Sequence, residues 1–186
     1  MWISPNYQVS DWAALDLTKQ MGWVKAVAIL HDRMNGRFFN IVKRIQGDDF
    51  SGFAVLALDC LLIESLQQFK EGVHTTPPLR GGEYFEKFLT QTSFGNHFNR
   101  STARKFYDQF RCGILHQAEI KKTSKVLRYG VLVRLTPDGE GLIINREKFH
   151  AELRRAFAAY LRELRVGADR QLRDNFKKKM GYICRQ

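Results

Sequence analysis

The sequence predicts a mainly α-helical domain with one β-hairpin inserted late, near residues 125–146. Through most of the chain apolar residues recur at spacings of three and four, which is the period of a helix with one buried face. Between residues 125 and 146 the period changes, because the runs KVLRYGVLVRL and GLIINR flank the segment TPDGE. A Pro-Asp-Gly turn between alternating apolar runs is typical of a hairpin. With 186 residues and 44% hydrophobic side chains, the chain is long enough for a single domain over residues 1–186 with a sizeable core.

The first long helix is expected from about Met21 to Ile45, after an N-terminal extension over residues 1–19. One stripe along it should face the core. That stripe contains Val24, Val27, His31, Met34, Phe38, Ile41 and Ile45. We expect His31 to be a hydrogen-bonded core residue rather than a ligand.

The second helix, SGFAVLALDCLLIESLQQFKEG, is apolar nearly all round and should be buried on several sides. Two acids, Asp59 and Glu64, lie within its apolar run. An unpaired buried carboxylate is costly, so each should have a cationic or N–H partner. Gly72 is expected to end this helix.

The remaining helices follow from the same spacing. A short helix is expected around Glu83 to Thr90, and Ser101 is a natural N-cap for the next one. The core stripe of that next helix is expected to contain Ala103, Phe106, Phe110 and Ile114. Residues 147–186 should form C-terminal helices with a basic tail, in which Gly167 ends one helix and Asp169 caps the last.

Composition narrows the function classes. The formal net charge of +11 favours a polyanionic partner, and nucleic acid is the default expectation. No apolar run approaches the roughly 20 residues that span a bilayer, so no membrane association is expected. The N-terminal residues lack the pattern of a secretory signal, and three widely spaced cysteines fit a reducing cytosol, so a cytoplasmic location is expected. No zinc motif is present, and neither a metal nor a cofactor is predicted.

The stretch KFYDQFRCGILHQAEIKK brings Arg111, Cys112 and His116 within six positions of a helix. In a purely structural interpretation, Arg111 pairs with Asp108 and Cys112 is packing. Cys112 and His116, four residues apart, could instead form a thiolate nucleophile with its base. The third interpretation joins Arg111 to His116, because an arginine can neutralise a phosphorane while a histidine moves a proton in RNA cleavage.

An Arg-x4-His near the end of a helix, in a small basic helical chain, resembles the HEPN superfamily (higher eukaryotes and prokaryotes nucleotide-binding). FYDQFRCGILHQAEI is similar to the signature helix of bacterial and plasmid-borne HEPN domains, and CLLIESLQQF is similar to the helix packed beside it. The resemblance covers roughly residues 20–166, with the hairpin as an elaboration. It implies a helical bundle that forms a homodimer through the signature helix. It also implies cleavage of RNA without metal, leaving a 2′,3′-cyclic phosphate, in a toxin or a phage- or plasmid-defence effector.

The resemblance assigns the catalytic roles to Arg111 and His116, and we expect Glu64 and Asp108 to support them. The position after the arginine is commonly polar in the family and is Cys112 here, so a non-catalytic RNA- or nucleotide-binding or protein-interaction HEPN domain stays open as the alternative. RNA phosphates are expected to contact lysines after the helix and in the basic tail. These lysines are Lys121, Lys122, Lys125, Lys177, Lys178 and Lys179. RNA, a second copy of the chain and a cognate antitoxin protein are the expected partners.

Overall fold

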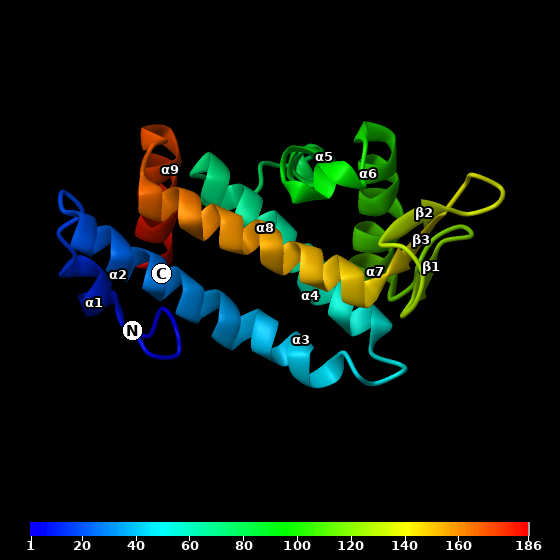
Figure 1. The fold of residues 1–186 in the computed structure, drawn as a ribbon, viewed down its shortest axis with the longest axis horizontal. Coiled ribbons are helices and arrows are strands. Elements are labelled where there is room, and N and C mark those ends of the chain that lie inside the picture. The colour runs from blue at the N-terminus through cyan, green and yellow to red at the C-terminus, as the bar shows by residue number, and fades with distance from the viewer. Residues whose placement is uncertain (186) are drawn as a thin grey trace. The chain divides into compact units, whose positions relative to one another are not determined.

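The computed structural model describes residues 1–185 and is mainly helical with one small sheet (Figure 1), which confirms the predicted fold class. Two long helices each contain a π-helical segment, η1 and η3. In chain order the elements are α1 (Val9–Ala13), α2 (Gln20–Met34), η1 (Asn35–Phe39), α3 (Asn40–Ile45), α4 (Gly52–Glu71), α5 (Gly81–Gln91), η2 (Ser93–Asn96), α6 (Arg100–Phe106), η3 (Tyr107–Arg111), α7 (Cys112–Gln117), β1 (Lys125–Leu127), β2 (Val133–Leu135), β3 (Leu142–Asn145), α8 (Arg146–Val166) and α9 (Arg170–Ile183).

The described chain divides into two compact units. Unit 1 contains Met1–Arg44, Gln68–Thr75 and the residues from Phe157 onward, and unit 2 contains Ile45–Gln67 and Thr76–Ala156. Helices α4 and α8 contribute residues to both units. The arrangement of a single domain over residues 1–186 stays a prediction.

Unit 1 has an aromatic core centred on Phe176 of α9. The rings of Trp12, Trp23 and Phe69 lie 5.7, 6.0 and 5.8 Å from it between centroids. The N-terminal segment is part of this unit, because Ile3 is buried and the Ser4 hydroxyl donates to Asp32 of α2 at 2.7 Å. The C-terminal helices begin and end as predicted: Gly167 has a left-handed φ of 76° after α8, and the Asp169 side chain caps α9.

The first long helix runs from Gln20 to Ile45, as predicted, but its buried stripe is different after Met34. The buried residues there are Phe39 and Val42, where the spacing predicted Phe38 and Ile41. The cause is η1: a π turn contains one residue more than an α turn, and across it the step from Met34 to the next buried residue, Phe39, is five positions. His31 is hydrogen-bonded, as expected, because its Nε2 accepts from the side-chain amide of Asn35 at 2.7 Å, but its side chain is exposed and is not part of the core.

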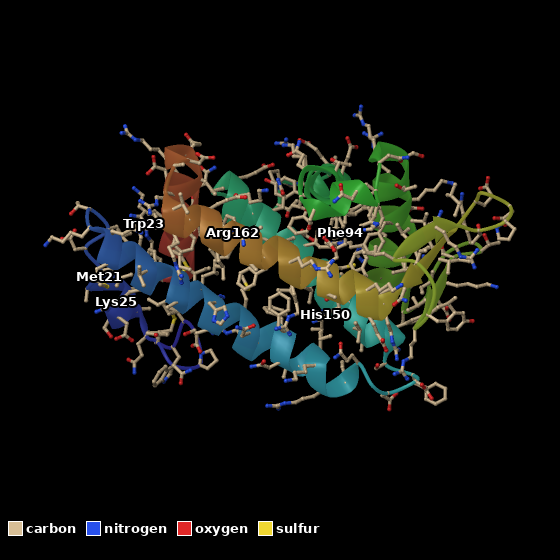
Figure 2. All side chains as sticks on the ribbon, in the orientation of Figure 1. Met21, Trp23, Lys25, Phe94, His150 and Arg162 are labelled. Atoms are coloured by element: carbon tan, nitrogen blue, oxygen red, sulfur yellow. The ribbon has the colours of Figure 1, made fainter. Side chains whose placement is uncertain are left out.

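Unit 2 is built around stacked phenylalanines. Phe94 (labelled in Figure 2) and Phe106 each lie 4.9 Å from Phe149 of α8, and Phe110 lies 5.1 Å from Phe106. All four side chains are fully buried. This core fixes the helices that hold the candidate site, because α6 and η3 contribute Phe106 and Phe110 to it.

The small sheet has the strand order β1-β3-β2. Strands β2 and β3 pair antiparallel across the predicted Pro-Asp-Gly turn, with Arg134 opposite Ile143. The first apolar run, however, forms two strands rather than one, and β1 pairs with β3 in parallel, with Val126 opposite Ile144. The run splits at Gly130, which has a left-handed φ of 89° in the middle of residues 125–135, whereas the alternation of apolar residues continues on both sides of it.

Helix α4 pairs both of its embedded acids, as predicted. Asp59 is fully buried and its Oδ1 lies 2.7 Å from Nδ1 of His150 on α8 (labelled in Figure 2). Burial raises the pKa of Asp59, and the hydrogen bond from His150 opposes that rise only in part. Within residues 1–185, α4 alone is long and apolar enough to cross a membrane by length and composition, yet more than half of its most apolar stretch is buried inside the fold. Together with the buried Asp59–His150 pair, this identifies α4 as a core helix.

Candidate functional site

The helix that contains Arg111 and His116, hereafter the Arg111 helix, runs without a break from Arg100 to Gln117 through α6, η3 and α7. Its cap is Asn99 rather than the predicted Ser101: the Asn99 side chain accepts from the Thr102 backbone amide, and the Asn99 backbone amide donates to the Thr102 hydroxyl. Asn and Ser are comparable caps, so the choice between neighbours depends on where the preceding loop joins the helix.

Arg111 and His116 are in direct contact, with Nη1 of Arg111 3.1 Å from Nε2 of His116. On an α-helix, residues five apart point about 140° away from each other, so this contact depends on the reach of the arginine side chain. A guanidinium can only donate hydrogen bonds, so Nε2 of His116 is the acceptor in this contact. His116 is exposed, so the lone pair on Nε2 becomes available whenever an incoming anion takes the arginine donor.

Glu64 of α4 holds the other side of Arg111. Its Oε2 lies 3.0 Å from Nη2 of Arg111, and both side chains are 18% exposed. Burial lowers the pKa of Arg111, but the hydrogen bond and the charge of Glu64 outweigh burial and hold that pKa above its ordinary value. The guanidinium is therefore a permanent cation with a fixed position.

Tyr107, one π turn before Arg111, is a contact that the sequence did not single out. The Arg111 guanidinium carbon lies 5.6 Å from the centre of the Tyr107 ring, within range of a cation–π interaction. The ring is itself held against the start of α5, where a Cβ on Gly81 would approach the Tyr107 hydroxyl to 2.3 Å. An aromatic residue four positions before an arginine on a helix was the available signal. Nε of Arg111 is buried without a hydrogen-bond partner among the described residues.

Asp108 does not support Arg111. Its side chain is 58% exposed and pairs with Lys121 at 3.2 Å, while Arg104 pairs with Glu86 at 2.7 Å. The expectation assumed an α-helical spacing, in which Asp108 and Arg111 share a face. Both residues lie in η3, where the wider turn separates them.

Cys112 is directed to Tyr107 rather than to His116. Burial raises the pKa of Tyr107, and the neighbouring thiol of Cys112 raises it further. Among the described contacts, His116 is bonded to Arg111. The geometry therefore favours the Arg111–His116 interpretation over a Cys–His nucleophile.

After His116 the chain folds back over its own helix. Ala118 has a left-handed φ of 55°, and the Glu119 amide donates to the Gly113 carbonyl at 3.3 Å. A Cβ on Gly113 would lie 2.3 Å from the Glu119 carbonyl oxygen, so only glycine fits there. The carbonyl of Gln109, within the π segment, accepts from the Lys121 amide at 3.1 Å. A glycine inside a helical pattern was the signal for this close approach.

The six lysines predicted to contact RNA fall into different environments. Lys121 and Lys122 form ion pairs with Asp108 and Glu140, at 3.2 and 3.1 Å, and Lys125 is exposed on β1. In unit 1, Lys177 pairs with Asp174 at 2.6 Å, and Lys178 is exposed.

The expectation for Lys179 is wrong. It is only 7% exposed, on the inner face of α9 beside Met180, and its ammonium donates to Gln68 at 2.8 Å and to the His74 carbonyl. Burial, and then the positive charge of Arg33, lower the pKa of Lys179 to about 8. A run of three consecutive lysines on a helix covers most of its circumference, so one of them points inward.

Comparisons with known proteins give no assignment: no protein-family model matches the chain, and neither a curated protein nor a solved structure is significantly similar to it. Within residues 1–185, no three His, Cys, Asp or Glu side chains are grouped so that they could hold a metal ion.

Proposed function

We propose that the protein is a metal-independent endoribonuclease of the HEPN type, a toxin or a phage- or plasmid-defence effector of the cytoplasm. The observation that carries the proposal is the 3.1 Å contact between Arg111 Nη1 and His116 Nε2, on an arginine fixed by Glu64. It supplies a proton acceptor and a permanent cation side by side at an exposed helix end.

The chemistry needs few groups. A ribose 2′-hydroxyl attacks the adjacent phosphorus, and the neutral Nε2 of His116 takes its proton. Arg111 donates to the phosphorane oxygens in place of its bond to His116, so the developing charge meets a cation that is already positioned. The bond from phosphorus to the 5′ oxygen then breaks, and that oxygen takes up a proton. The products are a 2′,3′-cyclic phosphate and a 5′-hydroxyl end.

The proposal includes a homodimer, in which two such pairs share one cleft and one histidine acts as base while the other acts as acid. The apolar face of the Arg111 helix is not available for this contact, because Phe106 and Phe110 are fully buried in the core of the same chain. The dimer would therefore use the outer face, where Leu115 is 36% exposed. Light scattering that gives only a monomer of 21.7 kDa at all concentrations would exclude it.

The test is cleavage of a labelled RNA in EDTA, with a matched RNA that lacks the 2′-hydroxyl at the cleaved position. His116→Ala and Arg111→Ala should each lower the rate by about 10²–10⁴-fold. His97→Ala and Arg104→Ala are matched controls, because both side chains are exposed in the same unit and should leave the rate unchanged. Cys112→Ser should be nearly silent.

The second candidate function is RNA binding without cleavage. It is supported by the contacts of Arg111 with both Glu64 and His116, because a domain that only binds RNA could contain the same contacts. The same experiment separates the two. If the parent binds RNA but never cuts it, and the Arg111 and His116 variants bind as the parent does, the domain is a binding module. Loss of cleavage in Cys112→Ser would instead support the Cys–His nucleophile.

A further inference from the structure

Unit 1 contains a groove that none of the predicted site residues line. It lies between α2 and the C-terminal half of α8, which run side by side in this unit (Figure 1). The hollow measures about 390 Å³ and is lined by Val27, Ala28, His31, Ala158, Leu161, Arg162 and Arg165. We call it the α2–α8 groove.

The floor of the α2–α8 groove is apolar and shallow. Ala28 of α2 and Ala158 of α8 both line it, and their short side chains leave the space that larger residues would fill. The ring of His31 forms one wall: it is exposed and lies parallel to the buried Phe157 ring, with an interplanar angle of 6° and centroids 6.5 Å apart. A flat aromatic ligand could therefore lie on apolar surface beside a ring that the protein already holds in place.

The rim of the groove is cationic. Arg162 (labelled in Figure 2) and Arg165 are both exposed and lie one turn apart on α8. Within residues 1–185 neither guanidinium has a hydrogen bond or ion pair, so both are free to bind a ligand. None of the described residues that line the groove is an acid. Asp32, next to His31 in sequence, is committed to the N-terminal segment, where it accepts from Ser4 and from Asn6 at 2.7 and 2.9 Å.

The lysines of α9 differ from these arginines. Lys177 is paired with Asp174 and Lys179 is buried, so of the three lysines predicted on α9 only Lys178 is both exposed and unpaired among the described residues. Arginine also differs from lysine in its planar fork of donors, which fits phosphate oxygens in pairs.

We propose that the α2–α8 groove binds single-stranded RNA, with one base on the apolar floor beside His31 and the neighbouring phosphates on Arg162 and Arg165. A hollow of this size is at the low end of the roughly 300–1,000 Å³ typical of small-ligand sites, which suits one nucleotide and excludes a duplex. Stacking on a π-face beside free cations is the general way in which proteins hold single strands. The proposal takes the identity of the polyanion from the proposed function, but it does not require cleavage.

The experiment measures binding in a full-length His116→Ala background, so that bound RNA stays intact. The probe is a fluorescent 12-nucleotide single-stranded RNA, titrated at several salt concentrations. Replacing Arg162 and Arg165 together by alanine should weaken binding about 10- to 100-fold. The slope of log affinity against log salt should fall by about 1.4, that is, about 0.7 for each lost phosphate contact on a single strand. Lys43→Ala with Arg44→Ala is the matched control, because it removes the same charge from exposed positions of the same unit that line no part of the groove.

A second variant tests the floor. Ala158→Glu adds a carboxylate to an exposed position without removing any contact, so it should fold and should weaken RNA binding as the arginine variant does. Equal losses in the Arg162/Arg165 variant and in the Lys43/Arg44 control would overturn the proposal, because binding would then be a diffuse charge effect. The proposal would also be overturned if the double arginine variant bound RNA as the parent does but no longer bound anionic phospholipid vesicles. That result would assign the groove to a membrane surface.

The two proposals fail in distinguishable ways. If RNA binding depends on Arg162 and Arg165 while the parent never cuts, the groove stands and the nuclease does not. If the parent cuts RNA and the double arginine variant binds and cuts as well as the parent, the nuclease stands and the groove does not.

Discussion

Two long helices of this protein, Gln20–Ile45 and the Arg111 helix, each contain one π-helical segment, but the segments have different consequences. In the first helix, η1 lengthens the step between buried residues Met34 and Phe39 to five positions. In the Arg111 helix the buried residues Phe106, Phe110 and Gly113 keep α-helical steps of four and three across η3. The first π turn therefore moves the core stripe, whereas across the second turn Phe106 and Phe110 stay buried as predicted and only the last member changes, from the half-buried Ile114 to Gly113.

The second π turn changes the positions of polar groups. It presents the Gln109 carbonyl to the Lys121 amide, turns Asp108 outward, and ends at Arg111, which meets Glu64 and His116. π turns are frequent at functional sites, yet here one of two has only packing consequences. A π turn therefore indicates function only when the groups that it reorients can do chemistry.

The largest expected difference between the two helices, in fold and in cleavage, should follow the deletion of one exposed residue from each π segment. Deleting Arg37 restores a four-residue step from Met34 to Phe39, so the fold should survive with a melting temperature lowered by no more than about 4 °C. Deleting Asp108 shortens the step from Phe106 to Phe110 to three and rotates Arg111 by about 100° relative to α6. Cleavage should fall at least ~10²-fold, because a displacement of about 1 Å is sufficient for such a loss.

Single-turnover cleavage and thermal unfolding of the two deletion variants, side by side, check this prediction. Retained cleavage after deletion of Asp108 would show that η3 does not position the pair. A failure of the Arg37 deletion to fold would show that η1 has a role beyond the register of the stripe.

A smaller effect is expected at the two glycines that allow close packing near each π turn. A Cβ on Gly36 would lie 2.2 Å from Cγ of Pro5, and one on Gly113 would lie 2.3 Å from the Glu119 carbonyl oxygen. Each alanine variant should lower the free energy of unfolding by about 1–3 kcal/mol, as overpacking does. Gly113→Ala should also slow cleavage, because it displaces the segment that folds back past His116. Gly36→Ala, assayed below its melting temperature, should cut at the parental rate, and a matching loss of activity there would contradict the comparison.

Much of the fold can be predicted from the sequence because the residues that end, cap or pair the helices act locally. Gly72, Gly167 and Asp169 end or cap helices by their own chemistry, and the burial of Asp59 in an apolar helix requires a partner wherever the chain places one. The two π turns could not be predicted in this way. An inserted residue leaves the apolar period intact on either side, and the expected stripe simply continued through Phe38 and Ile41.

The candidate site was predictable in its members but less so in its contacts. Arg111 and His116 follow from a motif, and Glu64 from a carboxylate that needed a partner. Asp108 and Lys179 were misplaced because sequence spacing gives a helical face only when the helix type and the inward side are known. The sequence does not distinguish the unpaired arginines of the α2–α8 groove from the other basic residues, because the fold decides which cations form ion pairs.

The smallest predicted effect concerns Tyr107, the aromatic residue at the start of η3. Its ring lies 5.6 Å from the Arg111 guanidinium and is held by Gly81, so it should help to keep the arginine in place. Tyr107→Leu should slow cleavage about two- to fivefold, the equivalent of an exposed cation–π contact of about 0.5–1 kcal/mol. Tyr107→Phe keeps the ring and should cut at nearly the parental rate, with the fold of both variants checked by circular dichroism. An equal loss in both variants would assign the effect to the hydroxyl, which interacts with Cys112. The aromatic ring would then not help to position Arg111, and Glu64 would be the residue that holds it.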